Sequence, residues 1–123
     1  MTREDGDLLF AYGTLRRGEP LHHLIAGRAA FLGEGWVTGT LLDLGRYPGL
    51  VAGEGRVRGE VYRLAHPGLL ATLDREEGYN FERRLTAVTL GDDRRARAWT
   101  YWYRGPRTRG VPIPEGDWRT RWR

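Results

Sequence analysis

The 123-residue sequence contains no Cys, Ser, Lys or Gln, and its single Met is the first residue. Without Cys or Ser, the chain cannot supply a thiol or serine nucleophile, a disulfide, or a thiolate ligand for a metal. Without Lys, it can form neither a Schiff base nor the lysine contact of a P-loop. Any catalysis by side chains therefore uses Asp, Glu, His, Tyr, Thr or Arg.

Long hydrophobic runs are also missing from the sequence. No uncharged apolar stretch approaches the roughly 20 residues of a membrane-spanning helix. The first residues, MTREDGD, are acidic and lack the basic and apolar regions of a signal peptide. We therefore expect a cytoplasmic protein with no membrane partner, in which residues 1–123 form a single domain.

Apolar segments of strand length recur between glycines, of which the chain has 18, and this pattern favours a compact sheet or barrel. Because these segments are rich in β-branched and aromatic residues, strands are predicted at residues 8–11, 36–42, 57–64, 83–90 and 96–103. The stretch between the second and third of these strands, RYPGLVAGEGR at residues 46–56, is predicted to be a loop or hairpin.

Two helices and a C-terminal tail complete the predicted organisation. A short helix is expected at residues 20–26, and a longer one over 66–77, with Gly78 as its C-terminal cap. Residues 104–123 are rich in Pro, Gly and Arg, which indicates an irregular tail wrapping the domain. Strands and a few short helices together make the predicted fold class α+β.

The net charge of +4 makes nucleic acid an alternative partner. Four tryptophans are interleaved with arginines towards the C-terminus, namely Trp99, Trp102, Trp118 and Trp122. However, 16 acidic residues are spread among the 20 basic ones, so mixed surface pairs are favoured over one continuous basic stripe. Nucleic acid is therefore the less favoured partner.

The histidines do not predict a metal site. His22 and His23 are adjacent and His66 is distant, so the three lack the spacing of metal ligands. Isolated histidines of this kind more often serve packing or lie on the surface. The sequence therefore predicts neither a metal nor a cofactor.

The chain carries a candidate binding turn at the end of its first strand, in LLFAYGTLRRGEP (residues 8–20). Gly13 permits a sharp turn after the strand, which would leave backbone N–H groups free. The amides of Gly13, Thr14 and Leu15, with the Thr14 hydroxyl beside them, would then form a concave group of donors suited to a carboxylate or phosphate. The alternative is an ordinary strand-ending turn.

The predicted helix over residues 66–77 carries a candidate catalytic carboxylate. At about 100° per residue, Leu69, Leu70 and Leu73 form one stripe that must face the core. Of the nearby acids, Glu77 lies closest to the centre of this stripe, about 35° away, against about 65° for Glu76. Partial burial and the negative end of the helix dipole would raise the pKa of Glu77 towards neutrality, as a general base requires.

The alternative for Glu77 is structural. A glutamate at a helix end can also form a surface ion pair, here with Arg83 or Arg84.

Four segments, in order and spacing, resemble the γ-glutamylcyclotransferase-like family across nearly the whole chain: FAYGTLRRGEP, RYPGLV, LDREEGYNFERRLTAVTL and IPEGDWR. The resemblance implies a small mixed β-barrel with a few short helices packed on it and a pocket at one mouth. It places the substrate-binding turn on Tyr12, Gly13, Thr14 and Leu15, and the catalytic acid/base on Glu77.

One departure from the family pattern follows Glu77. Relatives often carry Tyr-x-Arg where this chain has Phe81 and Arg83, which keeps the arginine and loses a hydroxyl. Arg83 is a candidate for orienting Glu77 or binding substrate, and Tyr101 or Tyr103 for forming a wall of the pocket. For each of them, packing or a surface ion pair is an equally supported role.

The resemblance also implies a reaction. In it a γ-glutamyl-amine or γ-glutamyl-amino acid cyclises to 5-oxoproline and releases the free amine, so the partner is a small γ-glutamyl molecule. The missing Ser and Cys fit this chemistry, because the substrate's own α-amine is the nucleophile. A binding module of the same fold without turnover is the alternative, and the sequence names neither the leaving amine nor the oligomeric state.

Overall fold

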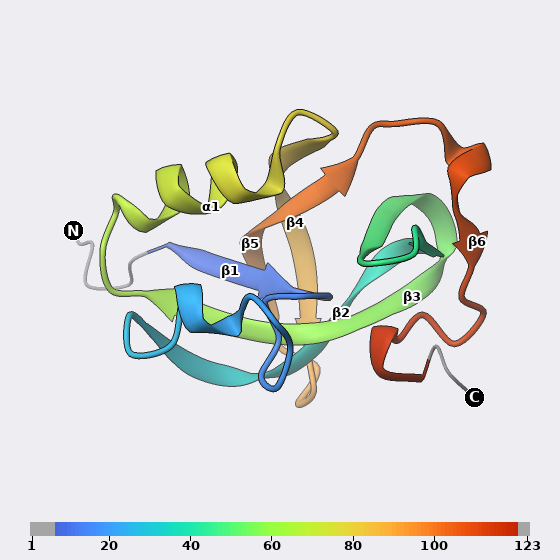
Figure 1. The fold of residues 1–123 in the computed structure, drawn as a ribbon. Helices are drawn as coiled ribbons and strands as arrows, with labels where there is room; N and C mark the ends of the chain where they lie inside the picture. Colours follow the sequence, from blue (N-terminus) through green and yellow to red (C-terminus); the bar gives the residue numbers. More distant parts are fainter. Residues whose placement is uncertain (1–6, 121–123) are drawn as a thin grey trace.

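Six β-strands form one curved sheet in the computed structural model, which describes residues 7–120 (Figure 1). The sheet order is β1-β3-β5-β4-β2-β6, and additional β3–β2 and β1–β5 pairings close it into a barrel. Strand β5 runs parallel to β1 and β3, whereas the other pairs are antiparallel, so the barrel is mixed. The strands are β1 (Leu8–Ala11), β2 (Ala29–Asp43), β3 (Pro48–Leu64), β4 (Phe81–Leu90), β5 (Arg95–Tyr103) and β6 (Val111–Pro112).

Two long strands, β2 and β3, build most of the barrel wall. They form one antiparallel hairpin from the Ala29–Leu64 pair to the Asp43–Pro48 pair, with two register shifts that bend it. Residues 46–56, predicted to be a loop or hairpin, belong to this hairpin, and most of them are strand. Gly53 allows the two strands of the hairpin to approach closely, because a Cβ at this position would lie 2.0 Å from Thr40 Oγ1.

All five predicted strands are present. The strands predicted at residues 8–11, 83–90 and 96–103 differ from the observed ones by at most two residues at an end, whereas β2 and β3 begin well before the predicted residues 36 and 57. The long helix, α1 (Leu69–Glu77), begins three residues later than predicted and ends where predicted. Gly78 follows it with φ of +80°, and its N–H donates to the Asp74 carbonyl over 3.2 Å. The predicted helix at residues 20–26 is only a single 3₁₀ turn, His22–Leu24.

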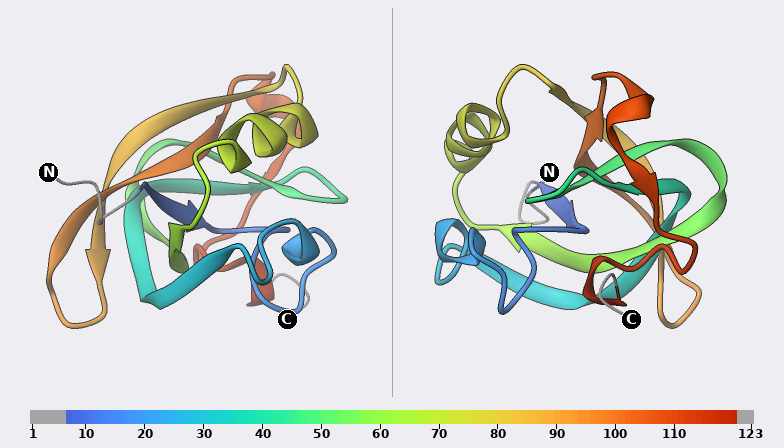
Figure 2. Two further views of the ribbon diagram at one scale, coloured as in Figure 1. Left: turned by 90° about the vertical axis from the view of Figure 1, so that its left-hand side faces the viewer. Right: turned by 45° about the vertical axis from the view of Figure 1, so that its right-hand side comes forward.

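Helix α1 lies outside the barrel and packs along β1 (Figures 1 and 2). Its leucine stripe, Leu69, Leu70 and Leu73, is buried as predicted. Burial of each of these side chains stabilises the fold by about 1.5–3 kcal/mol. One hydrophobic cluster fills the barrel interior and another lies between the barrel and α1. Neighbouring residues of β1 point to opposite sides, so Phe10 belongs to the first cluster and Leu9 to the second. The residues after β1 and the end of α1 therefore meet at one mouth of the barrel.

The tail, predicted to be irregular, contains short ordered elements. Residues Arg107–Arg109 form a 3₁₀ turn, β6 pairs with the end of β2, and Trp118–Thr120 form another 3₁₀ turn. Trp118 is 2% exposed and belongs to the barrel core, whereas Trp122 lies outside the described residues. Within residues 7–120, no helix has the length and apolar character needed to cross a membrane.

Candidate active site

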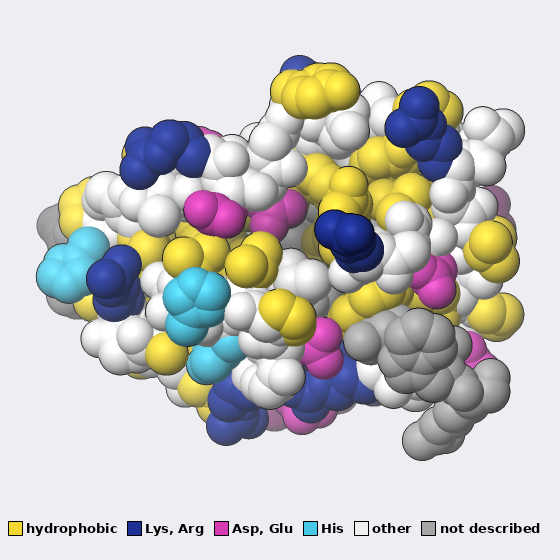
Figure 3. Space-filling model, in the orientation of Figure 1, with side chains coloured by type: hydrophobic (Ala, Val, Ile, Leu, Met, Phe, Trp, Pro, Cys, Tyr) yellow, Lys and Arg dark blue, Asp and Glu magenta, His cyan; other side chains and the backbone are white. Residues whose placement is uncertain are grey.

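A cavity of about 230 Å³ opens at the barrel mouth where the residues after β1 meet the end of α1. Figure 3 shows a hollow beneath α1 bordered by hydrophobic and acidic side chains. The volume lies below the roughly 300–1,000 Å³ of sites for drug-sized ligands, so it suits a small metabolite. Its lining is Phe10, Ala11, Tyr12, Gly13, Thr14, Leu15, Leu21, Tyr47, Pro48, Glu76, Glu77, Phe81 and Tyr101.

The Tyr12 side chain forms a wall of this cavity, and its hydroxyl is hydrogen-bonded to the backbone of two strands. The hydroxyl donates to the Tyr101 carbonyl over 2.7 Å and accepts from the Leu50 N–H over 3.2 Å. Burial, followed by the nearby Glu77 charge, raises the pKa of Tyr12, so its phenol stays neutral. The Tyr12 ring is therefore placed to contact a ligand, while its hydroxyl ties β1 to β3 and β5.

The turn after Tyr12, residues 13–15, lines the cavity, and its glycine serves a different purpose from the one predicted. Gly13 does not have a positive φ; a Cβ there would lie 2.5 Å from Pro48 Cγ, so the glycine permits close contact with β3. The carbonyls of Gly13 and Thr14 accept from the N–H groups of Arg16 (3.0 Å) and Leu21 (2.9 Å), within the loop that follows β1.

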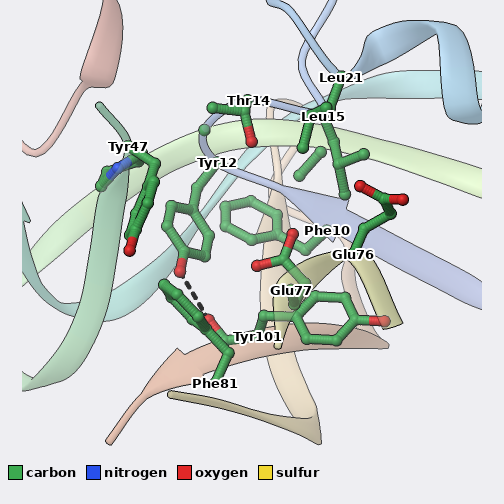
Figure 4. Close-up of a pocket in the computed structure, with 13 residues that line it drawn as sticks. Phe10, Tyr12, Thr14, Leu15, Leu21, Tyr47, Glu76, Glu77, Phe81 and Tyr101 are labelled. Atoms are coloured by element: carbon green, nitrogen blue, oxygen red, sulfur yellow. Dashed lines mark hydrogen bonds between the residues drawn. The ribbon is translucent and has the colours of Figure 1, made fainter. Parts of the chain in front are cut away.

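Because peptide units are planar and trans, the N–H groups of Thr14 and Leu15 point opposite to those two carbonyls. In residues 7–120, no turn or loop hydrogen bond uses the N–H of Gly13, Thr14 or Leu15. All three residues line the cavity, and Figure 4 shows the Thr14 hydroxyl directed towards it. The turn is thus able to bind an anion through backbone donors.

Glu77, the last residue of α1, projects its carboxylate into the middle of the cavity (Figure 4). The side chain is half-buried, and no described residue forms an ion pair with it. Burial above all, and then repulsion from the charges of Glu76 and Asp74, raise the pKa of Glu77 to about 7. A carboxyl group with this pKa can accept or donate a proton at neutral pH.

Asp74 lies one turn earlier on α1 and has the opposite electrostatic environment. Its burial works to raise its pKa, but hydrogen bonds from Arg83 and from the Tyr101 hydroxyl outweigh this and lower it. Arg83 Nε lies 2.8 Å from Asp74 Oδ1, and the Tyr101 hydroxyl donates to the same oxygen over 2.7 Å. The pKa values of Glu77 and Asp74 are therefore shifted in opposite directions, as in sites where one carboxyl group titrates and another stays ionised.

Arg83 is the one predicted binding residue that does not line the cavity. Arg83 forms an ion pair with Asp74, and its guanidinium lies over the Trp99 ring, 4.5 Å from the centroid. Arg84 forms an ion pair with Glu82. Neither arginine therefore forms the alternative ion pair with Glu77. Of the two candidate tyrosines, Tyr101 lines the cavity, whereas the Tyr103 hydroxyl donates to the Pro106 carbonyl over 3.1 Å.

The sequence did not predict the outer wall of the cavity. Tyr47 and Pro48 come from the start of the β3 hairpin, and the Tyr47 ring packs edge-on against Phe81, with centroids 5.8 Å apart. Tyr47 is 41% exposed, so this aromatic pair lies at the opening. The segment RYPGLV was noted as part of a loop or hairpin and for its resemblance, and Phe81 for the hydroxyl it lacks. Neither pattern indicates a cavity wall.

Metal-binding geometry is not found in the described part of the chain. Among residues 7–120, no group of three or more His, Asp or Glu side chains is arranged to hold a metal ion. The cavity itself holds a titratable carboxyl group, that of Glu77, and the turn of residues 13–15.

Comparison with known proteins agrees with this fold. The sequence model of the family described as "Gamma-glutamyl cyclotransferase, AIG2-like" matches residues 9–120. The chain is 37% identical to the γ-glutamylcyclotransferase family protein YtfP of Escherichia coli over 116 residues, covering 92% of this chain and 96% of YtfP.

Solved structures include PH0828 of Pyrococcus horikoshii, with 30% identity and a TM-score of 0.77, covering 95% of this chain and 93% of that one. An AIG2-like protein from mouse is 27% identical, with a TM-score of 0.66 and coverage of 78% and 76%. The family match spans the strands, the turn after β1 and helix α1 that together build the cavity. The chain therefore belongs to the γ-glutamyl cyclotransferase, AIG2-like family.

Proposed function

We propose that this protein is a γ-glutamyl cyclotransferase that converts a γ-glutamyl-amine or γ-glutamyl-amino acid into 5-oxoproline and a free amine. The observation that carries the proposal is that one small cavity holds both the Glu77 carboxyl group and the turn of residues 13–15. A γ-glutamyl group offers matching chemistry at each point, since its α-ammonium can give a proton to Glu77 and its α-carboxylate can accept from the turn.

The reaction needs no nucleophile from the protein. The α-nitrogen of the substrate attacks the γ-carbonyl carbon, a five-membered lactam closes, and the bond from that carbon to the leaving nitrogen breaks. Because both reacting groups belong to one molecule, a site that holds the folded conformer replaces a bimolecular encounter by an intramolecular one. A chain without Ser, Cys or Lys is sufficient for this reaction.

Glu77 carries the proton transfers in this proposal. In its ionised form it accepts a proton from the α-ammonium, which makes the nitrogen nucleophilic, and it then delivers this proton to the departing amine. The second proton that the same α-nitrogen loses as the lactam forms is taken up by the released amine, which leaves as an ammonium ion. With a pKa of about 7, Glu77 is a stronger base than an ordinary glutamate and can still return the proton. One carboxyl group therefore serves both halves of the reaction.

The other lining residues orient the substrate around this carboxyl group. The N–H groups of residues 13–15 and the Thr14 hydroxyl hold the α-carboxylate, and the rings of Tyr12 and Tyr101 form the walls. Arg83 acts indirectly, because it neutralises Asp74 and so limits the negative charge near Glu77.

The test is turnover of a panel of γ-glutamyl-amines and γ-glutamyl-amino acids, with 5-oxoproline measured by mass spectrometry. Wild type is compared with Glu77→Gln and with Glu54→Gln, which removes the same charge at an exposed position of β3. We expect turnover by wild type and Glu54→Gln, and a loss of at least about 100-fold in Glu77→Gln.

Two results would count against this proposal, the first against the role of Glu77 and the second against enzymatic activity. Equal turnover by wild type and Glu77→Gln would remove Glu77 from the chemistry. Ligands that raise the melting temperature and are recovered unchanged would identify the alternative, a binding module of the same fold.

A further inference from the structure

A cluster of buried charged side chains lies behind the binding turn, outside the cavity lining. The side chains of Arg16 and Glu60 are 4% and 0% exposed, and that of Asp117 is 19% exposed. Taking charges out of water is costly unless each is well paired, and such groups serve more often to fix one geometry than to add stability. The chemistry proposed above uses none of these three groups.

Arg16 links the turn to both acids. Its Nη1 donates to Asp117 Oδ1 over 2.8 Å, and its Nε lies 3.9 Å from Glu60 Oε2. Asp117 also accepts from the Arg119 N–H over 3.0 Å. Burial acts to raise the pKa of Asp117, but the hydrogen bonds from Arg119 and Arg16 lower it, so this acid is ionised at neutral pH.

Glu60, on β3, holds the next residue of the turn directly. Its Oε1 accepts from the backbone N–H of Arg17 over 2.9 Å and from the Tyr62 hydroxyl over 2.8 Å. Its Oε2 accepts from the Arg119 guanidinium over 3.1 Å, and that guanidinium also donates to the Arg17 carbonyl. The backbone at residues 16–17 is therefore fixed by a barrel strand and by the C-terminal segment together.

This fixation reaches the cavity through the backbone. The Arg16 N–H bonds the Gly13 carbonyl, which orients the peptide unit whose N–H belongs to Thr14. On the other side of the turn, His22 Nδ1 donates to the Leu15 carbonyl over 2.9 Å. A displacement of Arg16 would therefore rotate the N–H groups that face the ligand.

The C-terminal segment is a firm support for this arrangement. Trp118 lies in the barrel core at 2% exposure, and the Arg58 N–H on β3 donates to the Gly116 carbonyl over 2.8 Å. The residues before and after Asp117, Gly116 and Trp118, are therefore both fixed to the barrel. Residues near the two ends of the chain, 101 positions apart, thus join behind the site.

We propose that Arg16, Glu60 and Asp117 are positioning residues that hold the backbone donors of residues 13–15 in the geometry that binds the substrate α-carboxylate. The proposal rests on the proposed function for the identity of the ligand. A turn that is fixed before binding loses little conformational freedom when the ligand arrives, so the cluster acts on affinity. It touches neither Glu77 nor the reacting atoms.

The experiment compares wild type with Asp117→Ala, Asp117→Asn and the control Asp92→Asn, which breaks an exposed pair with Arg94 in the β4–β5 turn. For Asp117→Ala, we expect KM to rise about tenfold or more, with kcat within about threefold of wild type, because the interaction lost is one that binds. Asp117→Asn keeps an acceptor for Arg16, so it should recover part of the change, and the pH profile of kcat should not move.

A second arm does not depend on turnover. Calorimetric titration with 5-oxoproline, the proposed product, should show about tenfold weaker binding to Asp117→Ala than to wild type, and unchanged binding to Asp92→Asn. If Asp117→Ala does not fold, the same comparisons apply to Asp117→Asn with an expected change of about threefold.

The outcomes separate the two proposals. A variant that is less stable, but has the KM and product affinity of wild type, would overturn the positioning role and leave the proposed function intact. Weaker product binding by Asp117→Ala, combined with no turnover of any substrate by wild type, would support the positioning role and contradict the enzymatic one. Wild type that neither turns over substrates nor binds 5-oxoproline would overturn both.

Discussion

Replacing Glu77 by glutamine is expected to make the protein more stable, and this gain is expected to grow as the pH rises. The ordinary pKa of a glutamate, 4.5, applies to the unfolded chain, whereas burial and the charges of Glu76 and Asp74 raise the pKa of Glu77 in the fold to about 7. Between these values the folded protein holds a proton that the unfolded chain has released, so the stability of wild type falls as pH rises.

The size of the effect follows from the two pKa values. Each pKa unit corresponds to about 1.4 kcal/mol, so the ionised Glu77 carboxylate costs the fold up to about 3 kcal/mol above pH 7 and under about 1 kcal/mol at pH 5. Glutamine has nearly the same shape and no charge, so it removes this cost. At pH 8, the melting temperature of Glu77→Gln should exceed that of wild type by roughly 10 °C.

The assay is denaturant unfolding of wild type, Glu77→Gln and the exposed control Glu54→Gln at pH 5 and pH 8, with free energies from linear extrapolation. The difference between Glu77→Gln and wild type should increase by about 2–3 kcal/mol between the two pH values. Glu54→Gln should follow wild type within about 0.5 kcal/mol. If the difference between Glu77→Gln and wild type is the same at both pH values, Glu77 does not titrate near neutrality in the fold.

Three further variants test individual contacts of the site. Asp74→Asn removes one of the charges that, after burial, raise the pKa of Glu77, so the acidic limb of the pH–rate profile should move to lower pH; an unchanged profile would contradict this coupling. Tyr12→Phe leaves two buried backbone groups without their partner and should lower the free energy of unfolding by about 2 kcal/mol in chemical denaturation. In Gly13→Ala, the new Cβ would lie 2.5 Å from Pro48 Cγ; we expect a loss of about 1–3 kcal/mol and weaker binding of 5-oxoproline, and wild-type affinity would show that the turn tolerates displacement.

The helix that carries Glu77 was predictable because its pattern is local. The leucine stripe repeats with the helical period, Gly78 ends the helix with a positive φ, and the position of Glu77 relative to the stripe follows from residue spacing alone. Burial could be inferred in the same way. The repulsion from Asp74, which adds to the raised pKa, depends on side-chain placement that spacing does not determine.

The length of the strands in the β2–β3 hairpin was not predictable in the same way. Glycines at residues 49, 53, 55 and 59 interrupt the alternation of apolar and polar residues, and such a pattern ordinarily indicates a loop. In the fold, at least one of them, Gly53, is required by the close approach of Thr40 across the hairpin. The reason for the glycine is thus a tertiary contact.

The support of the binding turn was also hidden from the sequence. FAYGTLRRGEP and IPEGDWR were both recognised by resemblance, but nothing in either segment indicates that Arg16 pairs with Asp117. In the sequence, Arg16 and Asp117 are simply two oppositely charged residues in segments that lie far apart in the chain. Once the fold places the C-terminal segment beside the turn, burial of Arg16 and Glu60 makes the pairing evident.

The pH dependence of 5-oxoproline release by wild type and Glu77→Gln tests the central claim most directly, namely that Glu77 is the general base of a γ-glutamyl cyclotransferase. For wild type, kcat/KM should rise with pH and level off above the pKa of Glu77, about 7. For Glu77→Gln, it should be at least about 100-fold lower and lack this acidic limb. Wild-type rates in Glu77→Gln, or the same limb in both proteins, would contradict the claim.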